Sequence, residues 1–236
     1  MKFSIVIPCY NEYSNIPTLI NYILELKKDY DSEYILVENG STDRSKEYLQ
    51  NNIEGKYKNI KIAYVSKNEG YGFGVKQGLK LCTGDYLGWM HADMQVLPND
   101  LRIFFDFLLI MKSDQKVFLK AKRLNSSLLD RFFTTCQSVI SSIIFFLGMK
   151  DIGATPVIFS KSLIDSFDTM PNDFAIELFT YLTAKKKKFQ IKRFDIVINK
   201  RKYSVSSWNT GLLSKIKLSF LLIKSSLLIK FRNKNN

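Results

Sequence analysis

The sequence predicts an α/β protein that is built on a mostly parallel β-sheet with helices on its faces. Three runs of β-branched and aromatic residues, at 3–7, 34–37 and 60–65, are almost continuously apolar, as strands buried on both faces are. Each run is followed by a segment that can form a helix. Strands that alternate with helices in this way form right-handed βαβ crossovers, which pair the strands in parallel.

The first half of the chain supplies the strand and helix units of this sheet. Residues 15–28 place their apolar side chains on one helical face, and a polar turn after residue 37 leads into a second helix. Gly70, Gly72 and Gly74 open a third helix, which extends to about residue 81. Their spacing matches neither the dinucleotide nor the P-loop fingerprint, so phosphate binding and tight helix packing are both open explanations.

The second half continues the alternation and ends in a helix. The further elements that we expect are a helix from residue 98 to about 111, a strand at 117–120, a helix at 174–184, a strand at 189–198 and a helix at 212–231. A chain of 236 residues with 46% hydrophobic residues buries one sizeable core. We therefore expect one main domain over residues 1–207 and a C-terminal helical extension over 208–236.

Cysteines and charge limit the classes of protein that the chain can represent. Cys9, Cys82 and Cys136 are far apart and odd in number, which argues against a disulfide framework or a structural zinc site and favours a reducing compartment. The chain enters its first strand without a long apolar signal region, so we expect no export. A formal net charge of +13 suits nucleic acid, anionic lipid surfaces or phosphorylated substrates. The lysine run at 185–188 is typical of a solvated helix end.

A cluster of polar residues follows the apolar run that ends at Met90. His91, Asp93 and Gln95 alternate along the chain, so in an extended segment they point to one side. The carboxyl ends of the strands in an open α/β sheet are where ligands bind. This stretch is therefore the leading candidate for a metal or ligand site, and a polar turn without a function is the alternative.

Four short motifs in a fixed order resemble those of family-two glycosyltransferases with the GT-A fold, whose sheet is Rossmann-like. They are Val-Ile-Pro-Cys-Tyr-Asn-Glu at 6–12, Val-Glu-Asn-Gly-Ser-Thr-Asp at 37–43, Asn-Glu-Gly at 68–70 and His-Ala-Asp-Met-Gln at 91–95. Within that family the likeness is greatest to the dolichol-phosphate and polyprenyl-phosphate sugar transferases. The resemblance divides the domain into a nucleotide-sugar half, 1–97, and an acceptor half, 98–207.

The resemblance implies roles for individual residues. Asp93 and Gln95 match the ligands of a divalent metal, Mn²⁺ or Mg²⁺, that bridges the donor diphosphate. The positions that match the pocket for the nucleotide sugar are Pro8, Tyr10, Glu12, Glu38, Asn39, Asn68, Gly70 and His91.

Two positions depart from the family pattern. Glu38-Asn39 stands where the family usually has Asp-Asp, and His91 replaces the first Asp of the metal motif. Imidazole suits Mn²⁺ better than Mg²⁺, so His91 either ligates a softer ion or hydrogen-bonds a phosphate. We expect Asp93 and Gln95 to be the ligands and His91 to lie near the diphosphate.

On the acceptor side the resemblance points to three arginines and one aspartate. Arg123, Arg131 and Arg201 match positions that hold an acceptor phosphate, for which the guanidinium fork is well suited. Asp151 lies where many inverting GT-A enzymes have the base that activates a sugar hydroxyl. A lipid phosphate is already anionic and needs no base, so Asp151 discriminates between the two acceptors. Residues 201–208 resemble the closing loop of the family, without its usual Gly-x-Ser-Lys pattern.

Two apolar segments indicate contact with a membrane surface. Residues 132–149 carry no charge, but their hydroxyl groups lie opposite an apolar face, so an interfacial or core helix is expected rather than a membrane span. Residues 212–231 form a basic amphipathic helix that can lie in a bilayer interface, with a domain-closing helix or a dimer seam as the alternative.

Together these features predict an inverting, metal-dependent glycosyltransferase that moves a sugar from a nucleotide diphosphate to polyprenyl phosphate. Its expected place is the cytoplasmic face of the cell membrane, bound peripherally, with a homodimer possible. A hydroxyl of a lipid-linked glycan is the alternative acceptor. A nucleotidyltransferase would usually have a Gly-rich loop after the first strand, and this chain has Cys-Tyr-Asn-Glu there. A nucleic-acid-binding module would use the charge but leaves the polar residues at the strand ends without a role, so we expect no nucleic-acid partner.

Overall fold

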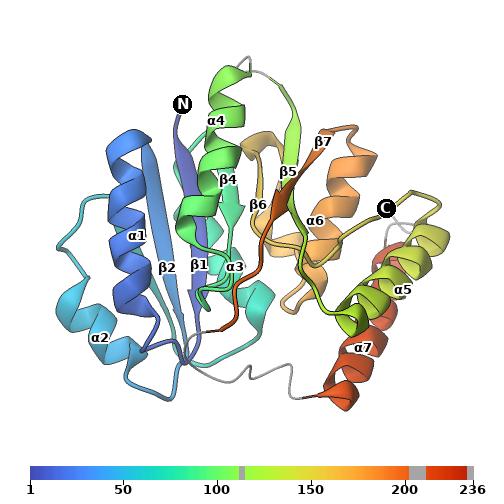
Figure 1. Cartoon of the computed structure of the whole chain (residues 1–236), viewed down its shortest axis with the longest axis horizontal. Coiled ribbons are helices and arrows are strands. Elements are labelled where there is room, and N and C mark those ends of the chain that lie inside the picture. Colours follow the sequence, from blue (N-terminus) through green and yellow to red (C-terminus); the bar gives the residue numbers. More distant parts are fainter. Residues whose placement is uncertain (112–114, 202–210, 233–236) are drawn as a thin grey trace.

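A computed structural model describes residues 1–111, 115–201 and 211–232 of the chain. Its centre is a seven-stranded sheet in the order β3-β2-β1-β4-β6-β5-β7 (Figure 1). The strands are β1 (Phe3–Cys9), β2 (Ser32–Asn39), β3 (Ile60–Val65), β4 (Tyr86–Trp89), β5 (Val117–Arg123), β6 (Val157–Ser160) and β7 (Gln190–Ile196). The predicted sheet is confirmed, and β5 and β7 extend the expected pairing to its far edge.

Most strand pairs are parallel. β1 pairs in parallel with both β2 and β4, β2 with β3, and β5 with β7. The exception is β6, which runs antiparallel to β4 and to β5. The carboxyl ends of β1, β2 and β4 therefore meet at one edge of the sheet, and the loops that leave them form one surface.

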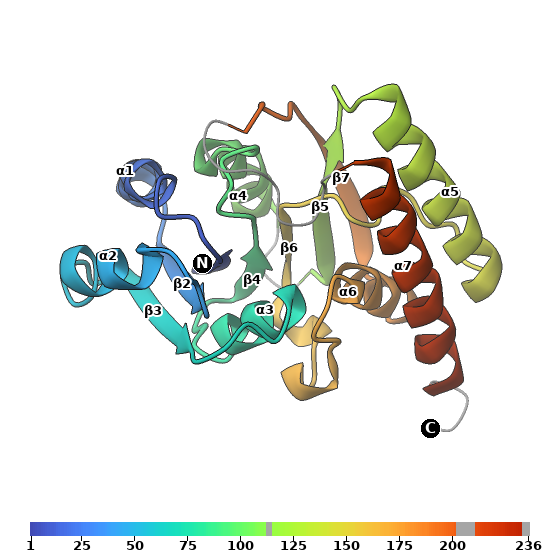
Figure 2. The same ribbon diagram turned by 90° about the horizontal axis from the view of Figure 1, so that it is seen from below.

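Helices cover both faces of the sheet. The α-helices are α1 (Ile16–Asp29), α2 (Ser45–Asn52), α3 (Tyr71–Leu79), α4 (Arg102–Ile110), α5 (Leu128–Phe145), α6 (Ala175–Lys186) and α7 (Leu212–Arg232), and the short 3₁₀ helices are η1 (Pro98–Leu101), η2 (Lys161–Leu163) and η3 (Phe167–Thr169). Helices α1 and α4 lie on one face, and α3 and α6 lie on the other (Figure 2). This arrangement is the layered architecture that strand and helix alternation predicts.

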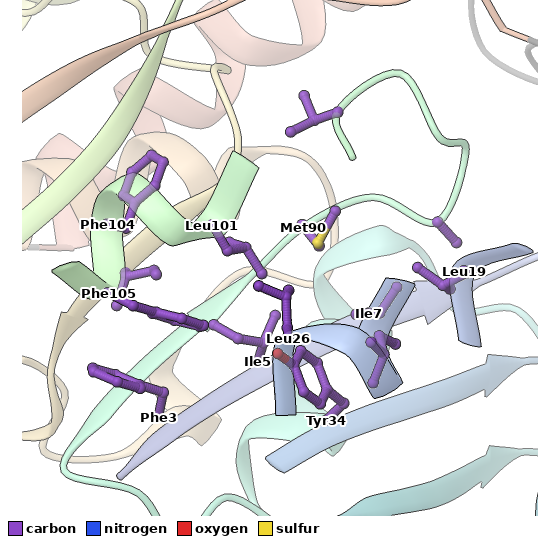
Figure 3. Packing of buried hydrophobic residues seen from close by; sticks show 14 of the residues in the cluster. Phe3, Ile5, Ile7, Leu19, Leu26, Tyr34, Met90, Leu101, Phe104 and Phe105 are labelled. Atoms are coloured by element: carbon purple, nitrogen blue, oxygen red, sulfur yellow. The ribbon is translucent and has the colours of Figure 1, made fainter. Parts of the chain in front are cut away.

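The alternation of side chains along β1 divides the core between the two faces. Phe3, Ile5 and Ile7 point toward α1 and α4, where Phe3 stacks on Phe105 with ring centroids 4.2 Å apart (Figure 3). Val6 points to the opposite face and packs with α3. Burial on both faces explains why this strand is continuously apolar in sequence.

Helices α5 and α7 lie side by side at one end of the molecule (Figures 1 and 2). The burial of α5 is the reverse of that in a core helix, because its buried positions are the serines Ser138 and Ser141. Its large apolar residues point outward, and Phe132 and Ile143 are 62% and 66% exposed. In the described residues, no helix is long and apolar enough to cross a membrane.

Candidate functional site

The carboxyl edge of β1, β2 and β4 opens into a cavity of about 610 Å³. Most of the sequence-predicted site residues line it, namely Pro8, Tyr10, Glu12, Asn39, Asn68, His91, Asp93, Gln95, Arg123 and Arg201. Four more residues complete the lining, Tyr71, Ala92, Phe174 and Lys200. Residues from nearly the whole length of the chain therefore meet where the topology predicts a ligand site.

Hydrogen bonds join the loops that follow β1 and β2 on one side of the cavity. The backbone amide of Asn11 donates to Ser41 Oγ over 3.1 Å, and that of Glu12 donates to Ser45 Oγ over 3.0 Å. Asn11 has a positive φ of 57°, which an asparagine tolerates better than most residues. The two loops form one rigid wall, from which Tyr10 and Glu12 face the cavity.

Glu12 is a partly buried carboxylate in that wall. Burial raises its pKa to about 6, against the opposing effect of a hydrogen bond that Asn15 donates over 2.5 Å. Asp93 raises the pKa further through its negative charge. The cavity thus holds two carboxyl groups, those of Glu12 and Asp93.

Glu38 and Asn39 serve different purposes although they are neighbours. Glu38 is buried, does not line the cavity, and accepts a hydrogen bond from the backbone of Ser41 over 2.6 Å. Asn39 lines the cavity and donates to the carbonyl oxygen of Gly70 over 3.2 Å. Its buried Oδ1 has no hydrogen-bond partner among the described residues. Asn39 is therefore the member of the pair that can contact a ligand, whereas Glu38 shapes the turn.

The glycines at the start of α3 pack closely against other parts of the chain. A Cβ added at Gly70 would lie 2.5 Å from the carbonyl oxygen of Asn172, and one at Gly72 would lie 2.5 Å from that of Pro171. At Gly74 an added Cβ would meet the side chain of Asn39 at 2.9 Å. Gly70 does not line the cavity. Helix packing, one of the two explanations open from the sequence, accounts for these glycines.

Asp93 is held by hydrogen bonds to both of its carboxylate oxygens. Its side chain is buried, and Oδ2 accepts a charged hydrogen bond from Arg201 over 2.7 Å. Oδ1 accepts from the backbone amide of Gln95 over 3.1 Å, across a turn in which Met94 has a φ of 58°. Gln95 is tied in turn to Asn199, whose backbone amide donates to its carbonyl oxygen over 2.8 Å. The loop after β7 is thereby attached to the loop after β4.

His91 lies against an aromatic wall. Its ring centroid is 5.0 Å from that of Tyr71, and Tyr71 stacks on Phe174 at 4.8 Å. Burial lowers the pKa of His91 and outweighs the opposing effect of Asp93, so the imidazole is neutral at neutral pH. A neutral imidazole can accept or donate a hydrogen bond and can ligate a metal.

The donor set of the cavity suits a divalent cation when a diphosphate completes it. Within the described residues, no group of three or more His, Cys, Asp and Glu side chains could hold a metal alone. A carboxylate (Asp93), an amide oxygen (Gln95) and an imidazole (His91) nevertheless line the same space. Mixed oxygen and nitrogen ligands fit Mn²⁺, and cations of this kind are often held by one or two protein groups plus substrate phosphates. The residues therefore fit a metal, which would share the Asp93 carboxylate with Arg201.

A second cavity of about 330 Å³ adjoins the first, because His91, Asp93, Gln95, Arg123 and Lys200 line both. Its far side is the start of α5, where Ser127 caps the helix by accepting from the backbone amide of Asp130 over 3.1 Å. Arg123 donates to the carbonyl oxygen of Gly153 over 2.6 Å. Two cations, Arg123 and Lys200, thus stand between the cavities.

Two of the residues proposed for the acceptor side lie elsewhere. Arg131 is exposed on α5 and lines neither cavity. Asp151 also lines neither cavity, and it accepts a hydrogen bond from Arg193 over 2.7 Å. The structure therefore brings Arg123 and Arg201 to the site but not Arg131 or Asp151. Residues 202–208 of the expected closing loop lie outside the described part of the chain.

Four lining residues were not among the predicted site residues, and three of them, Tyr71, Phe174 and Lys200, also lie outside the sequence motifs. Tyr71 and Phe174 are aromatic residues at helix starts. A single aromatic residue there has no sequence pattern that tells whether it lines a cavity or packs in the hydrophobic core. Lys200 stands in a basic run and is exposed, so sequence alone does not separate it from its neighbours. Its adjacency to Arg201 was the only available signal.

Comparisons with known proteins agree with this geometry. Residues 4–115 match the family model described as Glycosyl transferase family 2. The undecaprenyl-phosphate 4-deoxy-4-formamido-L-arabinose transferase of Photorhabdus laumondii is 33% identical over 102 residues, which are 42% of this chain and 31% of the relative. The enzyme of the same name from Pseudomonas fluorescens is 32% identical over 100 residues, 42% of this chain and 29% of the relative. The matches thus span about three tenths of the length of these relatives.

Solved structures extend the comparison to nearly the whole chain. Glucosyl-3-phosphoglycerate synthase from Mycobacterium tuberculosis, in complex with Mn²⁺, UDP and glucosyl-3-phosphoglycerate, has a TM-score of 0.69 and 15% identity and covers 97% of this chain and 79% of its own. The same enzyme with Mn²⁺, UDP-glucose and phosphoglyceric acid gives a TM-score of 0.69 at 14% identity, with the same coverage. At this identity the likeness shows the fold. The chain therefore has the GT-A fold, and its residues 4–115 match the family model of the family-two glycosyltransferases.

Proposed function

We propose that the protein is an inverting glycosyltransferase that moves a sugar from a nucleotide diphosphate to the phosphate of a polyprenyl lipid. The observation that carries this proposal is the pair of adjoining cavities, which share Asp93 and Arg123 at their boundary. The larger cavity has the polar lining that the donor needs, and the smaller one is bordered by cations. The names of the curated relatives, which are undecaprenyl-phosphate sugar transferases, support the lipid phosphate as the acceptor.

The first task of the chain is to hold the donor. Pro8, Tyr10, Glu12, Asn39 and Asn68 would surround the nucleoside, and His91 and Arg201 would face the diphosphate. A divalent cation on Asp93 and Gln95, with Mn²⁺ favoured over Mg²⁺ by a nearby imidazole, would stabilise the negative charge that develops on the departing nucleoside diphosphate. Mn²⁺ is bound in the related synthase structures. Arg201, paired with Asp93, adds a fixed positive charge beside the same oxygens.

The second task is to bring the acceptor in line. Arg123 and Lys200 would hold the lipid phosphate between the cavities, and the start of α5 adds the positive end of its dipole. A phosphate oxygen forms the new bond to the anomeric carbon while the bond from that carbon to the donor diphosphate breaks, with inversion. The attacking oxygen is already anionic, so no base is required. The position of Asp151, paired with Arg193 and outside both cavities, supports this acceptor over a sugar hydroxyl.

The α5–α7 pair would hold the enzyme at the membrane surface where such lipids reside. Both helices bury serines, Ser138 and Ser141 on α5 and Ser225 and Ser226 on α7. Helix α7 also buries Leu222 and Ile229, but both helices direct other large apolar residues outward. Helices that pack through small residues and expose large apolar ones are typical of a lipid environment. Lys224 and Lys230 on α7 and the net charge of +13 favour an anionic bilayer, with lysine stems reaching toward the headgroups. We place the protein peripherally on the cytoplasmic face.

The acceptor assignment is tested by comparing two acceptors in one assay. The purified protein is incubated with a panel of nucleotide sugars, MnCl₂ or MgCl₂, and either a short polyprenyl phosphate or a lipid-linked saccharide. We expect transfer to the phosphate, and an Asp151→Asn variant that keeps most of this activity. Transfer to the saccharide alone, abolished by Asp151→Asn, would instead show that the acceptor is a hydroxyl.

A further inference from the structure

A buried carboxylate, Glu177 on α6, lies behind the wall of the donor cavity. The residue is 5% exposed, and its Oε1 accepts hydrogen bonds from Trp89 Nε1 over 2.6 Å and from the hydroxyl of Tyr71 over 3.1 Å. The other oxygen, Oε2, is buried without a hydrogen-bond partner in the described residues. Glu177 itself does not line the cavity, so it has no direct access to a ligand there.

The two donors belong to elements that shape the cavity. Trp89 is the last residue of β4 and precedes His91 by two positions, so the two side chains leave the chain on the same side. Tyr71 is the first residue of α3, and its ring lies between His91, at 5.0 Å, and Phe174, at 4.8 Å. Glu177 therefore joins β4, α3 and α6 at one point. It lies directly behind Tyr71, His91 and Phe174, the three aromatic side chains that face the cavity.

The aromatic wall formed by Tyr71, His91 and Phe174 is tightly packed. The segment before α6 rests on the glycines of α3, and the backbone amide of Phe73 donates to the carbonyl oxygen of Asn172 over 2.8 Å. Even a methyl group at Gly70 or Gly72 would collide with that backbone. A shift of Tyr71 would consequently move His91 and Phe174 rather than be absorbed by free volume.

Retaining a charge-bearing group here is costly for folding. Burial raises the pKa of Glu177 to about 7, although the hydrogen bond from Trp89 and the charge of Lys120 act in the opposite direction. Lys120 is itself fully buried and donates to the carbonyl oxygen of Ile152 over 3.0 Å. Buried charged groups contribute little to stability compared with well-packed apolar residues. A gain in stability therefore does not explain the carboxylate at this position. The two hydrogen bonds that it accepts do explain it.

We propose that Glu177 is a positioning residue of the donor site, which fixes Tyr71 and Trp89 and thereby seats His91 and Phe174 against the bound nucleoside diphosphate. This inference rests on the proposed function, because it assumes that the larger cavity holds the donor. It makes the aromatic wall, and not only the motif residues, a determinant of donor affinity.

The test measures binding of ADP, CDP, GDP and UDP in the presence of MnCl₂ by calorimetry, together with thermal unfolding of each variant. The nucleotide that binds the full chain most tightly is used throughout. Glu177→Leu removes the acceptor of both hydrogen bonds and replaces it with an apolar side chain of similar size. Glu177→Gln keeps an oxygen acceptor, and Tyr71→Phe removes one hydrogen bond only. Glu33→Gln is the matched control, because Glu33 is also a buried, hydrogen-bonded carboxylate but lies away from the cavity.

We expect Glu177→Leu to weaken nucleotide binding by about ten-fold or more, as the loss of hydrogen bonds to a charged group implies. Tyr71→Phe should weaken it in the same direction, and Glu177→Gln should retain most of the affinity. The control should unfold at a lower temperature and bind as the unaltered protein does. Binding that is unchanged in both Glu177→Leu and Tyr71→Phe would overturn the inference. So would a loss of binding in Glu33→Gln as large as that in Glu177→Leu, because it would follow from lower stability alone. If the unaltered protein binds none of the four nucleotides, the proposed function fails and the inference fails with it.

Should Glu177→Leu not fold, the comparison of Tyr71→Phe with Glu177→Gln decides the matter. Tyr71→Phe must then weaken nucleotide binding more than Glu177→Gln does. The reverse order would show that the hydrogen bond to Tyr71 does not position the wall.

Discussion

The ion pair between Asp93 and Arg201 links residues more than a hundred positions apart at the point where the two cavities meet. Both residues were predicted from the sequence, Asp93 from the polar alternation after a strand and from the family motif, and Arg201 from the resemblance to the closing loop of the family. It did not predict that they touch, since nothing in a single sequence places the loop after β7 against the loop after β4. The contact with Asn199 that brings them together depends on backbone groups, which every residue carries.

Removing the charge of Asp93 should abolish most of the activity. Asp93→Asn removes the negative charge of the residue that we propose as a metal ligand and that pairs with Arg201, so we expect turnover to fall by about a hundred-fold or more, as when a major electrostatic group is removed from an active site. Asp151→Asn is the control, because it removes a carboxylate that lies outside both cavities. Steady-state rates with the best donor measure both. An Asp93→Asn variant as active as the control would contradict the donor-site assignment.

Glu33 makes stability depend on pH in a predictable direction. Burial alone would raise its pKa, but hydrogen bonds from Ser4, Thr83 and Lys61 lower it to about 2. A carboxylate whose pKa is lower in the folded state stabilises the protein above its unfolded pKa of about 4.5, and the effect is lost as pH falls toward 2. The free energy of unfolding should therefore differ between the unaltered protein and Glu33→Gln at pH 7, by up to about 3 kcal/mol.

That difference should shrink steadily as the pH is lowered from 4.5 toward 2. Chemical denaturation across this range measures it. A difference that stays constant with pH would mean that Glu33 has the same pKa in the folded and unfolded protein.

At the scale of elements, the start of α3 shows where sequence reasoning stops. The helix and its glycines were expected, but whether the glycines serve phosphate binding or packing was left open. The structure answers through contacts with residues 171–173, a hundred positions away, which no local pattern contains.

A methyl group at Gly72 should therefore be destabilising. Gly72→Ala places a Cβ 2.5 Å from the carbonyl oxygen of Pro171, and we expect a loss of about 1–3 kcal/mol, as for other overpacked sites. Gly148→Ala is the matched control, because no atom lies within 4 Å of the added Cβ. Denaturant unfolding compares the two, and equal stabilities would show that the segment before α6 is not packed as described.

Helices α5 and α7 were predicted in sequence with their amphipathic character. Which face would be buried was not, because a pattern of apolar and hydroxyl residues is the same whether the apolar side meets the core or the lipid. On α5 the buried residues are serines, so its apolar side points outward. Helix α7 buries Leu222 and Ile229 as well as serines, while Phe220 and Leu228 point outward. These exposed apolar residues make the helix pair a candidate membrane surface.

Removing exposed apolar residues from this surface should weaken membrane binding. Phe132 and Phe220 are 62% and 69% exposed, so the double variant Phe132→Ser, Phe220→Ser should sediment with anionic vesicles several-fold less than the unaltered protein. Ile110→Ser on α4 is the control, because Ile110 is 87% exposed on another part of the molecule. Equal loss in the variant and the control would point to general hydrophobic adhesion. No loss in either would exclude the α5–α7 pair as the contact.

For the whole molecule, the alternation of strands and helices was sufficient to predict the sheet, its mostly parallel pairing and the edge at which ligands bind. The same alternation did not predict that β6 is antiparallel. It also did not predict which residues would line the smaller cavity. Strand order in the second half depends on tertiary packing, and the displacement of Arg131 and Asp151 from the site follows from that packing. The larger cavity, which is lined mainly by motif residues, was therefore easier to predict than the smaller one.

The central claim is that the anomeric carbon of the donor is transferred to an oxygen of the lipid phosphate. Mass spectrometry of both products from a reaction with polyprenyl phosphate tests it most directly. The account predicts a lipid that carries the sugar on a single phosphate and the release of a nucleoside diphosphate. A lipid that carries the sugar on a diphosphate, with release of a nucleoside monophosphate, would show that a phosphoryl group moves instead, and would contradict it.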